Sequence, residues 1–265
     1  MSLARRPAEI PRAPPGIEPE RASCHDPPAT GPDTDVQNDF SNLSGRAPGR
    51  FVSLASLALP GVRSVQQQVA PFADAWRRRN AEVLAPSSEV GGPLWVALGD
   101  SMTLGIGASA PDQGWVGQLA TGMTGWRVLN LAINGGRVRD VLDRQLPVLE
   151  GLAEPPELIT LLIGSNDLMS PRLRKSLSGD LATLLARLPV GTVVGNQPGG
   201  YRAALRVNRM IDDAVTEQGL VLAELRDPRT RNWRNKLAAD RFHPNDRGYR
   251  GIAEVFGEAI ERVIG

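Results

Sequence analysis

The chain of 265 residues is poor in the side chains that build metal and redox sites. Its single cysteine, Cys24, excludes an intrachain disulfide framework and any paired-cysteine zinc or redox motif. His25 and His243 are the only histidines, so a histidine-built metal site is not expected either. We therefore expect a function that uses no metal and no cofactor.

Strong net charge and long apolar runs are also lacking. The formal net charge is +1, so no overall field points to nucleic acid or to a membrane as a partner. The sequence has no run of 18 or more apolar residues, which argues against a membrane-spanning helix. Hydrophobic residues make up 41% of the chain, which is enough for an ordinary globular core.

Residues 1–50 are rich in proline and show no apolar periodicity. They carry nine of the 22 prolines in the chain. A stretch of this kind cannot bury enough surface to offset the entropy of ordering it. We predict a disordered tail over residues 1–50.

Residues 51–93 contain a short apolar segment, an amphipathic helical region and a linker. Apolar residues recur there at intervals of three and four, which predicts a helix packed on a neighbouring domain: Val62, Val65, Val69, Phe72 and Trp76. Pro71 should kink this helix or start a second one. The alternative is peripheral membrane contact or dimer formation through residues 51–84, with the arginines at 77–79 facing lipid headgroups.

The apolar segment 51–62 also bears on localisation. Arg46 and Arg50 precede it, as basic residues precede the apolar part of a secretory signal, but no clean cleavage site follows. We expect a cytoplasmic protein. Peripheral membrane attachment or secretion is the alternative if residues 51–62 act as a signal segment.

From residue 94 to residue 265, short apolar runs alternate with helical patterns. The runs predict strands covered on both faces, over 94–98, 127–132, 158–163, 191–196 and 220–225. Helices are predicted over 113–123, 137–152, 173–188, 202–218 and 246–263. Strand–helix alternation implies right-handed crossovers, so we predict a three-layer α/β/α sandwich with a five-stranded parallel sheet in flavodoxin-like order.

Polar residues follow these strands, where ligands bind in open parallel sheets. The first strand is followed by Gly99, Asp100 and Ser101, and the second by Gly135 and Gly136, whose amides can approach a ligand closely. Any one of these groups is also an ordinary turn or helix cap.

Two further groups complete the pattern. Asn166 and Asp167 follow the third strand, and Asp240 precedes His243 by three residues, so that a carboxylate can reach an imidazole. Each is again typical of a cap when taken alone. The four groups occur in order at successive strand ends, and together they supply different parts of one reaction.

That reaction is acyl transfer. Ser101 is the candidate nucleophile, and His243 is the candidate base that takes its proton and later acts as an acid. Asp240 would fix the imidazole tautomer and offset its charge. The amides of Ser101 and Gly135 and the side chain of Asn166 are the candidate oxyanion donors.

The stretches GDSMTLG, NLAINGG, IGSND and DRFHPND resemble the four sequence blocks of the SGNH, or GDSL-type, hydrolase family. Ser101, Gly135, Asn166 and His243 match the residues from which that family takes its name. The resemblance covers about residues 94–263 and implies a flavodoxin-like fold and a metal-free serine esterase, lipase, thioesterase or deacetylase. Asn134 stands where the family often has a serine, which predicts a slightly altered oxyanion loop.

The expected partner is a small-molecule ester with a short acyl group, because the segments between the four blocks are too compact to form a lid. Acyl transfer to an alcohol or sugar, and a non-catalytic binding relative of the same fold, are the alternatives. Residues 226–250 carry eight basic and three acidic side chains, which attract an anionic substrate or simply form a solvated surface. Trp115 and Trp233 belong either to the acyl pocket or to the core.

Overall fold

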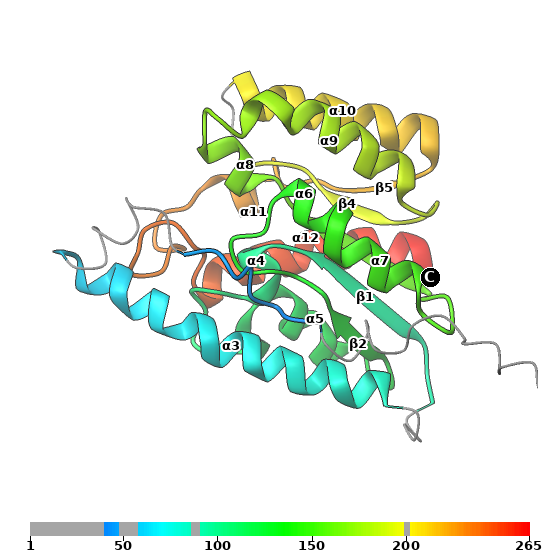
Figure 1. Cartoon of the computed structure of the whole chain (residues 1–265), viewed down its shortest axis with the longest axis horizontal. Helices are drawn as coiled ribbons and strands as arrows, with labels where there is room; N and C mark the ends of the chain where they lie inside the picture. The colour runs from blue at the N-terminus through cyan, green and yellow to red at the C-terminus, as the bar shows by residue number, and fades with distance from the viewer. Residues whose placement is uncertain (1–39, 48–57, 86–90, 199–201) are drawn as a thin grey trace, which may run out of the picture. The chain divides into compact units, whose positions relative to one another are not determined.

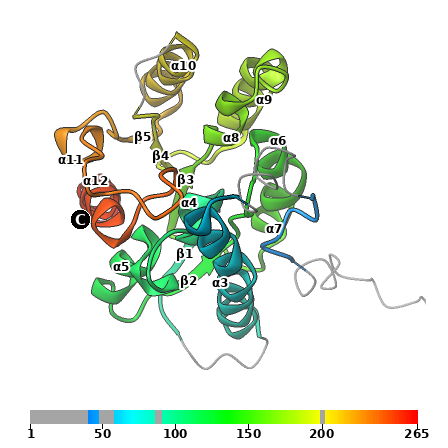
Figure 2. The same cartoon turned by 90° about the vertical axis from the view of Figure 1, so that its left-hand side faces the viewer.

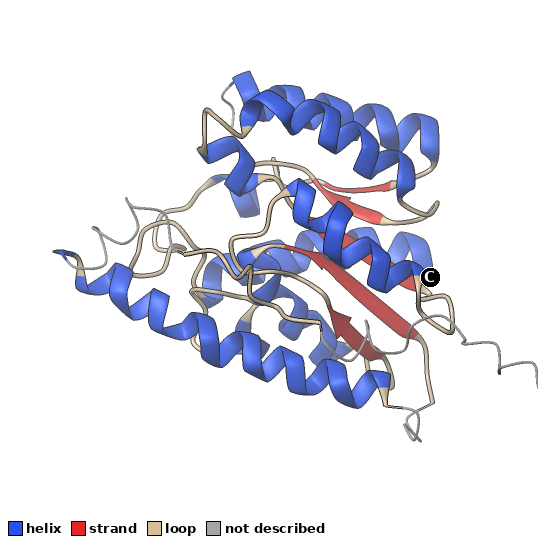
Figure 3. Cartoon of the chain, viewed as in Figure 1, coloured by secondary structure: helices blue, strands red, loops and turns tan. Residues whose placement is uncertain are grey.

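The computed structural model describes residues 40–47, 58–85, 91–198 and 202–265. Five parallel strands form one sheet in the order β2-β1-β3-β4-β5, which confirms the predicted flavodoxin-like order. The strands are β1 (Leu94–Gly99), β2 (Arg127–Asn130), β3 (Leu158–Leu162), β4 (Val193–Gly195) and β5 (Val221–Ala223). Each lies within or within one residue of its predicted range. Figure 1 shows their arrangement, and Figure 3 shows the strands lying between helices.

β1 is buried along its whole length, because helices cover both faces of the sheet. Leu94, Val96 and Leu98 point to one face, and Trp95 and Ala97 point to the other. The described helices of the first face contribute apolar side chains to one core cluster with these residues of β1: α6 (Val138–Asp140), the π-helical turn η2 (Val141–Gln145), α7 (Leu146–Glu150), α9 (Arg174–Arg187) and α10 (Arg202–Gln218). The predicted three-layer α/β/α sandwich is therefore confirmed (Figure 2).

The second face is covered by the two longest described helices, by one shorter helix and by the largest buried aromatic side chains. Its helices are α3 (Pro60–Leu84), α5 (Trp115–Gly122) and α12 (Asp246–Ile264). Trp115 is fully buried there and stacks on Phe256, with 4.2 Å between ring centroids. Trp115 is thus a core residue, and the alternative that it lines an acyl pocket is wrong. Four short helices complete the described elements: α4 (Ser101–Leu104), η1 (Pro111–Gln113), α8 (Ser165–Met169) and α11 (Pro228–Arg231).

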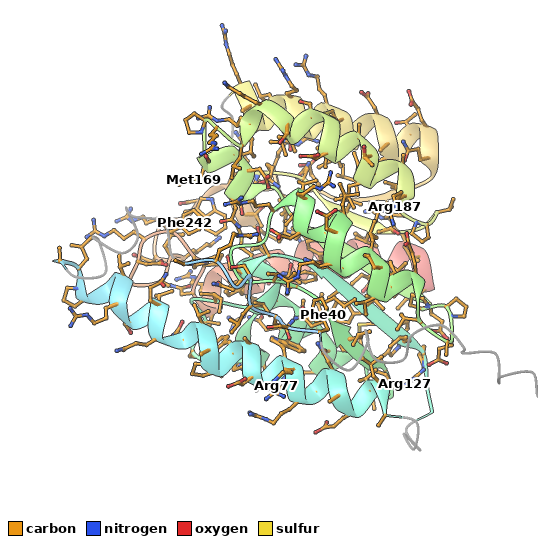
Figure 4. All side chains as sticks on the ribbon, in the orientation of Figure 1. Phe40, Arg77, Arg127, Met169, Arg187 and Phe242 are labelled. Carbon is orange, nitrogen blue, oxygen red and sulfur yellow. The ribbon has the colours of Figure 1, made fainter. Side chains whose placement is uncertain are left out.

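α3 packs beside β2 through the predicted apolar stripe. Val65, Phe72 and Trp76 are buried, so this stripe is occupied by the rest of the fold. The expectation that Pro71 starts a second helix is wrong, because α3 continues through it. Pro71 is exposed, so water can bond the carbonyl that the proline leaves without a donor. Arg77 projects away from the sheet and pairs with Asp74 at 3.6 Å (Figure 4).

Residues 40–47 depart from the prediction of a disordered tail over residues 1–50. Asn42 is buried and donates hydrogen bonds to two backbone carbonyls of the β2 region. These long-range bonds, which a proline-rich composition does not reveal, offset the entropy of ordering the segment. The rest of that tail, and residues 51–57 of the predicted signal or membrane segment, lie outside the described residues. No helix in the described part of the chain is long and apolar enough to cross a bilayer.

Candidate active site

Ser101 lies at the end of β1, at the start of the short helix α4. Gly99 ends the strand with a φ of 153°, and a Cβ there would lie 2.3 Å from the hydroxyl of Thr103. Only glycine therefore fits this tight turn. The carboxylate of Asp100 then caps α4 by accepting a 2.9 Å hydrogen bond from the amide of Met102. Ser101 follows with 3% of its surface exposed.

The turn that carries Asp240 and His243 reaches the same place from the far end of the chain. Asp240 Oδ1 accepts hydrogen bonds from the amides of Phe242 and His243, both at 3.0 Å. Its Oδ2 lies 2.6 Å from His243 Nδ1, and His243 Nε2 lies 3.0 Å from Ser101 Oγ. Three side chains that sequence analysis selected thus form one hydrogen-bonded chain.

The charge state of Asp240 supports this arrangement. Burial alone would raise the pKa of its carboxyl group, but the hydrogen bond and charge of His243 outweigh it, so the pKa is lowered. The group is therefore a carboxylate at neutral pH and accepts a hydrogen bond from Nδ1–H of the imidazole. Nε2 of His243 is then left to accept the hydroxyl proton of Ser101.

Gly107 makes room for this turn, a role that sequence analysis did not identify. Its φ is 97°, and a Cβ on it would lie 2.6 Å from the carbonyl of Pro244 and 2.7 Å from Cβ of His243. The hydroxyl of Tyr249 on α12 fixes the neighbouring backbone by donating to the carbonyl of Ile106 at 2.6 Å. The GIG tripeptide at 105–107 is the only sequence signal for this close approach.

Gln145 is a second site-supporting residue that sequence analysis missed. Its side-chain amide accepts from the N–H of Gly99 and donates to the C=O of Gly99, both at 2.8 Å. It projects from the π-helical turn η2, which breaks the single helix predicted over 137–152. Nothing in the sequence distinguishes this glutamine from one on a solvated helix.

The predicted oxyanion donors lie around Ser101. Gly135 has a φ of 66°, and neither its amide nor that of Ser101 has an acceptor within the described residues. Asn166 Nδ2 donates to the carbonyl of Gly136 at 2.8 Å and makes a long 3.3 Å contact with Asp100. One of its two amide hydrogens is thus firmly bonded, and the other is weakly held.

Comparison with known proteins places this fold in a family. A model of the GDSL-like lipase/acylhydrolase family matches residues 97–250, which is more than half of the chain. The chain belongs to this family. As a member of the GDSL-like family it is a hydrolase that acts on ester bonds.

Solved structures share the fold of this GDSL-like chain. TesA superposes with a TM-score of 0.53 at 20% identity, over 64% of this chain and 99% of TesA. The psychrotrophic esterase EstA from Pseudoalteromonas sp. gives 0.53 at 18% identity, over 64% and 98% of the two chains. A lipolytic G-D-S-L family protein from Veillonella parvula gives 0.52 at 20% identity, over 64% and 100%. No curated protein matches the chain.

Two buried carboxyl groups lie beside the GDSL-like site. Burial raises the pKa of Asp100, although it accepts a 2.7 Å hydrogen bond from Ser165. Burial, and then the charge of Asp100, raise the pKa of Asp167 to about 6. Within the described residues, no cluster of three or more histidine, cysteine or acidic side chains could hold a metal ion.

We expect Asp167→Asn to stabilise the protein at neutral pH but not in acid. The native carboxyl group of Asp167 holds its proton up to about pH 6, whereas the unfolded one loses it near pH 4. As the pH rises from about 4 to about 6, the free energy of unfolding of the natural protein should therefore fall, by up to about 3 kcal/mol. The asparagine variant has no proton to lose there, so its free energy of unfolding should not show this fall. Urea unfolding of both proteins at pH 4.0, 5.0 and 7.5 measures it. A difference that is constant with pH would contradict the expectation.

A small apolar pocket lies beside Asp100 and Met102, the two neighbours of Ser101 in the sequence. It has about 10 Å³ of free volume, room for about one water molecule, and Met102, Leu225, Trp233 and Ile252 help to line it. Trp233 lines this pocket and also packs against the hydrophobic core of the second face. Two large apolar side chains are exposed: Phe242, on the turn that carries His243, and Met169, the last residue of α8 (Figure 4).

The basic stretch 226–250 is partly neutralised within the fold. Arg226 pairs with Glu224 and Asp212, and Arg229 pairs with Asp227 and Glu258. Its net positive charge is therefore offset by acidic partners from outside the stretch. This pairing favours the interpretation of a solvated surface over that of an anion-attracting site.

Proposed function

We propose that this protein hydrolyses carboxylic esters with short acyl groups through an acyl-enzyme intermediate on Ser101. The observation that carries the proposal is the chain of contacts from Asp240 to His243 to Ser101, at 2.6 and 3.0 Å. A serine hydroxyl is a weak nucleophile until a base accepts its proton, and an imidazole needs a fixed tautomer to do so. Both conditions are met by these three side chains.

In the first half-reaction, Ser101 Oγ attacks the ester carbonyl while His243 Nε2 takes the hydroxyl proton. The tetrahedral intermediate collapses, the bond to the alcohol breaks, and His243 returns the proton to the leaving oxygen. In the second half-reaction, water loses a proton to His243 and attacks the acyl group. The acid is released, and Ser101 regains its proton. Asp240 stabilises the imidazolium in both steps.

The negative charge of each tetrahedral intermediate needs hydrogen-bond donors. The amides of Ser101 and Gly135 are unoccupied by acceptors within the described part of the chain. The second hydrogen of Asn166 Nδ2, which makes only a long 3.3 Å contact with Asp100, is the candidate third donor. Donors placed in advance cost no reorganisation during the reaction, and each is typically worth about 3–4 kcal/mol.

The preference for short acyl groups is supported by the small pocket that Met102 and Trp233 line. A pocket with room for about one water molecule does not accept a long chain without rearrangement. For nitrophenyl esters of two, four, eight and twelve acyl carbons, we expect kcat/KM to fall by about tenfold or more beyond four carbons. Trp233→Ala should flatten the profile by enlarging the pocket. Rates that rise with chain length in the natural protein would contradict the assignment.

A further inference from the structure

The N-terminal segment 40–47 lies outside the region that the family model matches, yet it contacts the candidate site. Asn42 Nδ2 donates to the carbonyls of Asn130 and Ala132 at 2.9 and 2.7 Å. The carbonyl of Asn42 accepts from the amide of Asn134 at 2.9 Å, and Leu43 forms a parallel bridge with Asn134. This segment, blue in Figure 1, therefore pairs with the loop that follows β2.

Arg46 extends these contacts into the oxyanion loop, which we define as residues 133–137. Its guanidinium makes two 2.7 Å hydrogen bonds to the two carboxylate oxygens of Asp140. Its Nη2 also donates to the carbonyl of Gly135 at 3.0 Å. A planar guanidinium held by a carboxylate at two points has little freedom, so its third contact is fixed in direction.

The oxyanion loop has few side-chain anchors of its own. Gly135 has no side chain, and a Cβ placed on it would meet nothing within 4 Å. Backbone contacts must therefore set the direction of its amide. Asn42 holds the N–H of Asn134 on one side, and Arg46 holds the C=O of Gly135 on the other. Asn166 holds the next carbonyl, that of Gly136.

We propose that Arg46 is a positioning residue of the ester hydrolase. Its bond to the carbonyl of Gly135 fixes the peptide that follows this residue, and the bond from the amide of Asn134 to Asn42 fixes the peptide before Asn134. The peptide between them, which carries the Gly135 amide, is thus restrained from both sides and kept directed at the oxyanion. The proposal rests on the function proposed above. Because Asp140 neutralises the guanidinium, Arg46 acts through geometry rather than through its charge. The loss of one such restraint should lower kcat and leave KM nearly unchanged, since the restrained donor acts in the transition state.

The test compares the full-length protein with three variants on a two-carbon nitrophenyl ester. Arg46→Ala should lower kcat by about tenfold, since a displaced oxyanion donor loses much of its effect. Arg46→Lys, which can keep the ion pair with Asp140 but not the guanidinium fork, should fall between the alanine variant and the natural protein. The rate of labelling by a fluorophosphonate, which also creates charge in this hole, should fall in parallel.

Arg187→Ala is the matched control. Arg187, labelled in Figure 4, also makes two hydrogen bonds to one carboxylate, both from Nη2 to Glu150, at 2.7 and 2.8 Å. Its side chain is 40% exposed, against 37% for Arg46, but it lies on α9 away from the loop. Arg46→Ala should lose more thermal stability than Arg187→Ala, because it leaves the buried carboxylate of Asp140 unpaired whereas Glu150 is half exposed. Only Arg46→Ala should lose kcat.

Equal kcat in the two alanine variants would overturn the proposal, as would a change confined to KM. If Arg46→Ala does not fold, Arg46→Lys is compared with Arg187→Lys, and equal kcat in that pair has the same meaning. Ser101→Ala is included as a separate arm. Undiminished ester hydrolysis in Ser101→Ala would contradict the proposed function itself, whatever the arginine variants do.

Discussion

Ser101→Ala is expected to lower kcat for a short-acyl nitrophenyl ester by about 10⁴-fold or more. The hydroxyl that His243 Nε2 approaches to 3.0 Å is removed, so no acyl-enzyme can form. The remaining donors and the pocket would still bind substrate, which explains why some rate above that of water should persist. KM should change little. Steady-state kinetics and the loss of fluorophosphonate labelling measure the effect.

Ser165→Ala is the appropriate comparison for this prediction. Ser165 is a second hydroxyl beside the site, where it donates to Asp100 at 2.7 Å. Its loss removes one support of the capping carboxylate and no proposed reacting group, so kcat should fall by less than about tenfold. Retention of more than about one hundredth of kcat in Ser101→Ala would show that another group is the nucleophile.

Asn166→Ala is expected to lower kcat by about 10²–10³-fold, with a small change in KM. Two losses combine in this variant. The candidate oxyanion donor disappears, and the carbonyl of Gly136 loses the 2.8 Å bond that restrains the oxyanion loop. The measurement is again kcat and KM for a short-acyl ester, together with the thermal midpoint to show that the variant is folded.

Asn166→Asp separates the loss of a donor from the loss of bulk. The carboxylate has nearly the same size but donates nothing and repels both the carbonyl of Gly136 and a developing oxyanion. We expect it to be at least as inactive as the alanine variant. If it instead retained near-natural kcat, Asn166 would serve only to fill space, and the oxyanion would have to be held by the amides of Ser101 and Gly135.

The parts of the fold that sequence patterns predicted are those that local chemistry determines. Strands such as residues 94–98 and 158–163 are continuous apolar runs, which only a sheet covered on both faces accommodates. Glycines and polar residues at the strand ends then located Ser101 and Asn166, because ligands bind beyond the carboxyl ends of parallel strands. The contact of His243 with Ser101 could be predicted because a serine nucleophile requires a base to accept its proton.

The features that sequence patterns missed depend on contacts between distant residues. Asn42 bonds carbonyls 88 and 90 positions away, and no composition rule foresees that order in a proline-rich stretch. Gly107 is required by the approach of a turn that begins more than 130 residues later. Pro71 fits inside α3 because its face of the helix is exposed. In each case tertiary surroundings overrode a local tendency.

β2 is an edge strand of the sheet, and a side chain of α3 forms hydrogen bonds with its free edge. The side chain of Asn80 donates to the carbonyl of Asn130 at 2.7 Å and accepts from its N–H at 2.9 Å, as a neighbouring strand would. Open sheet margins are templates on which other chains add strands and aggregate. A single amide on a helix therefore occupies the place that an intruding strand would take, and a chain cut down to the family-matched residues would lose this protection.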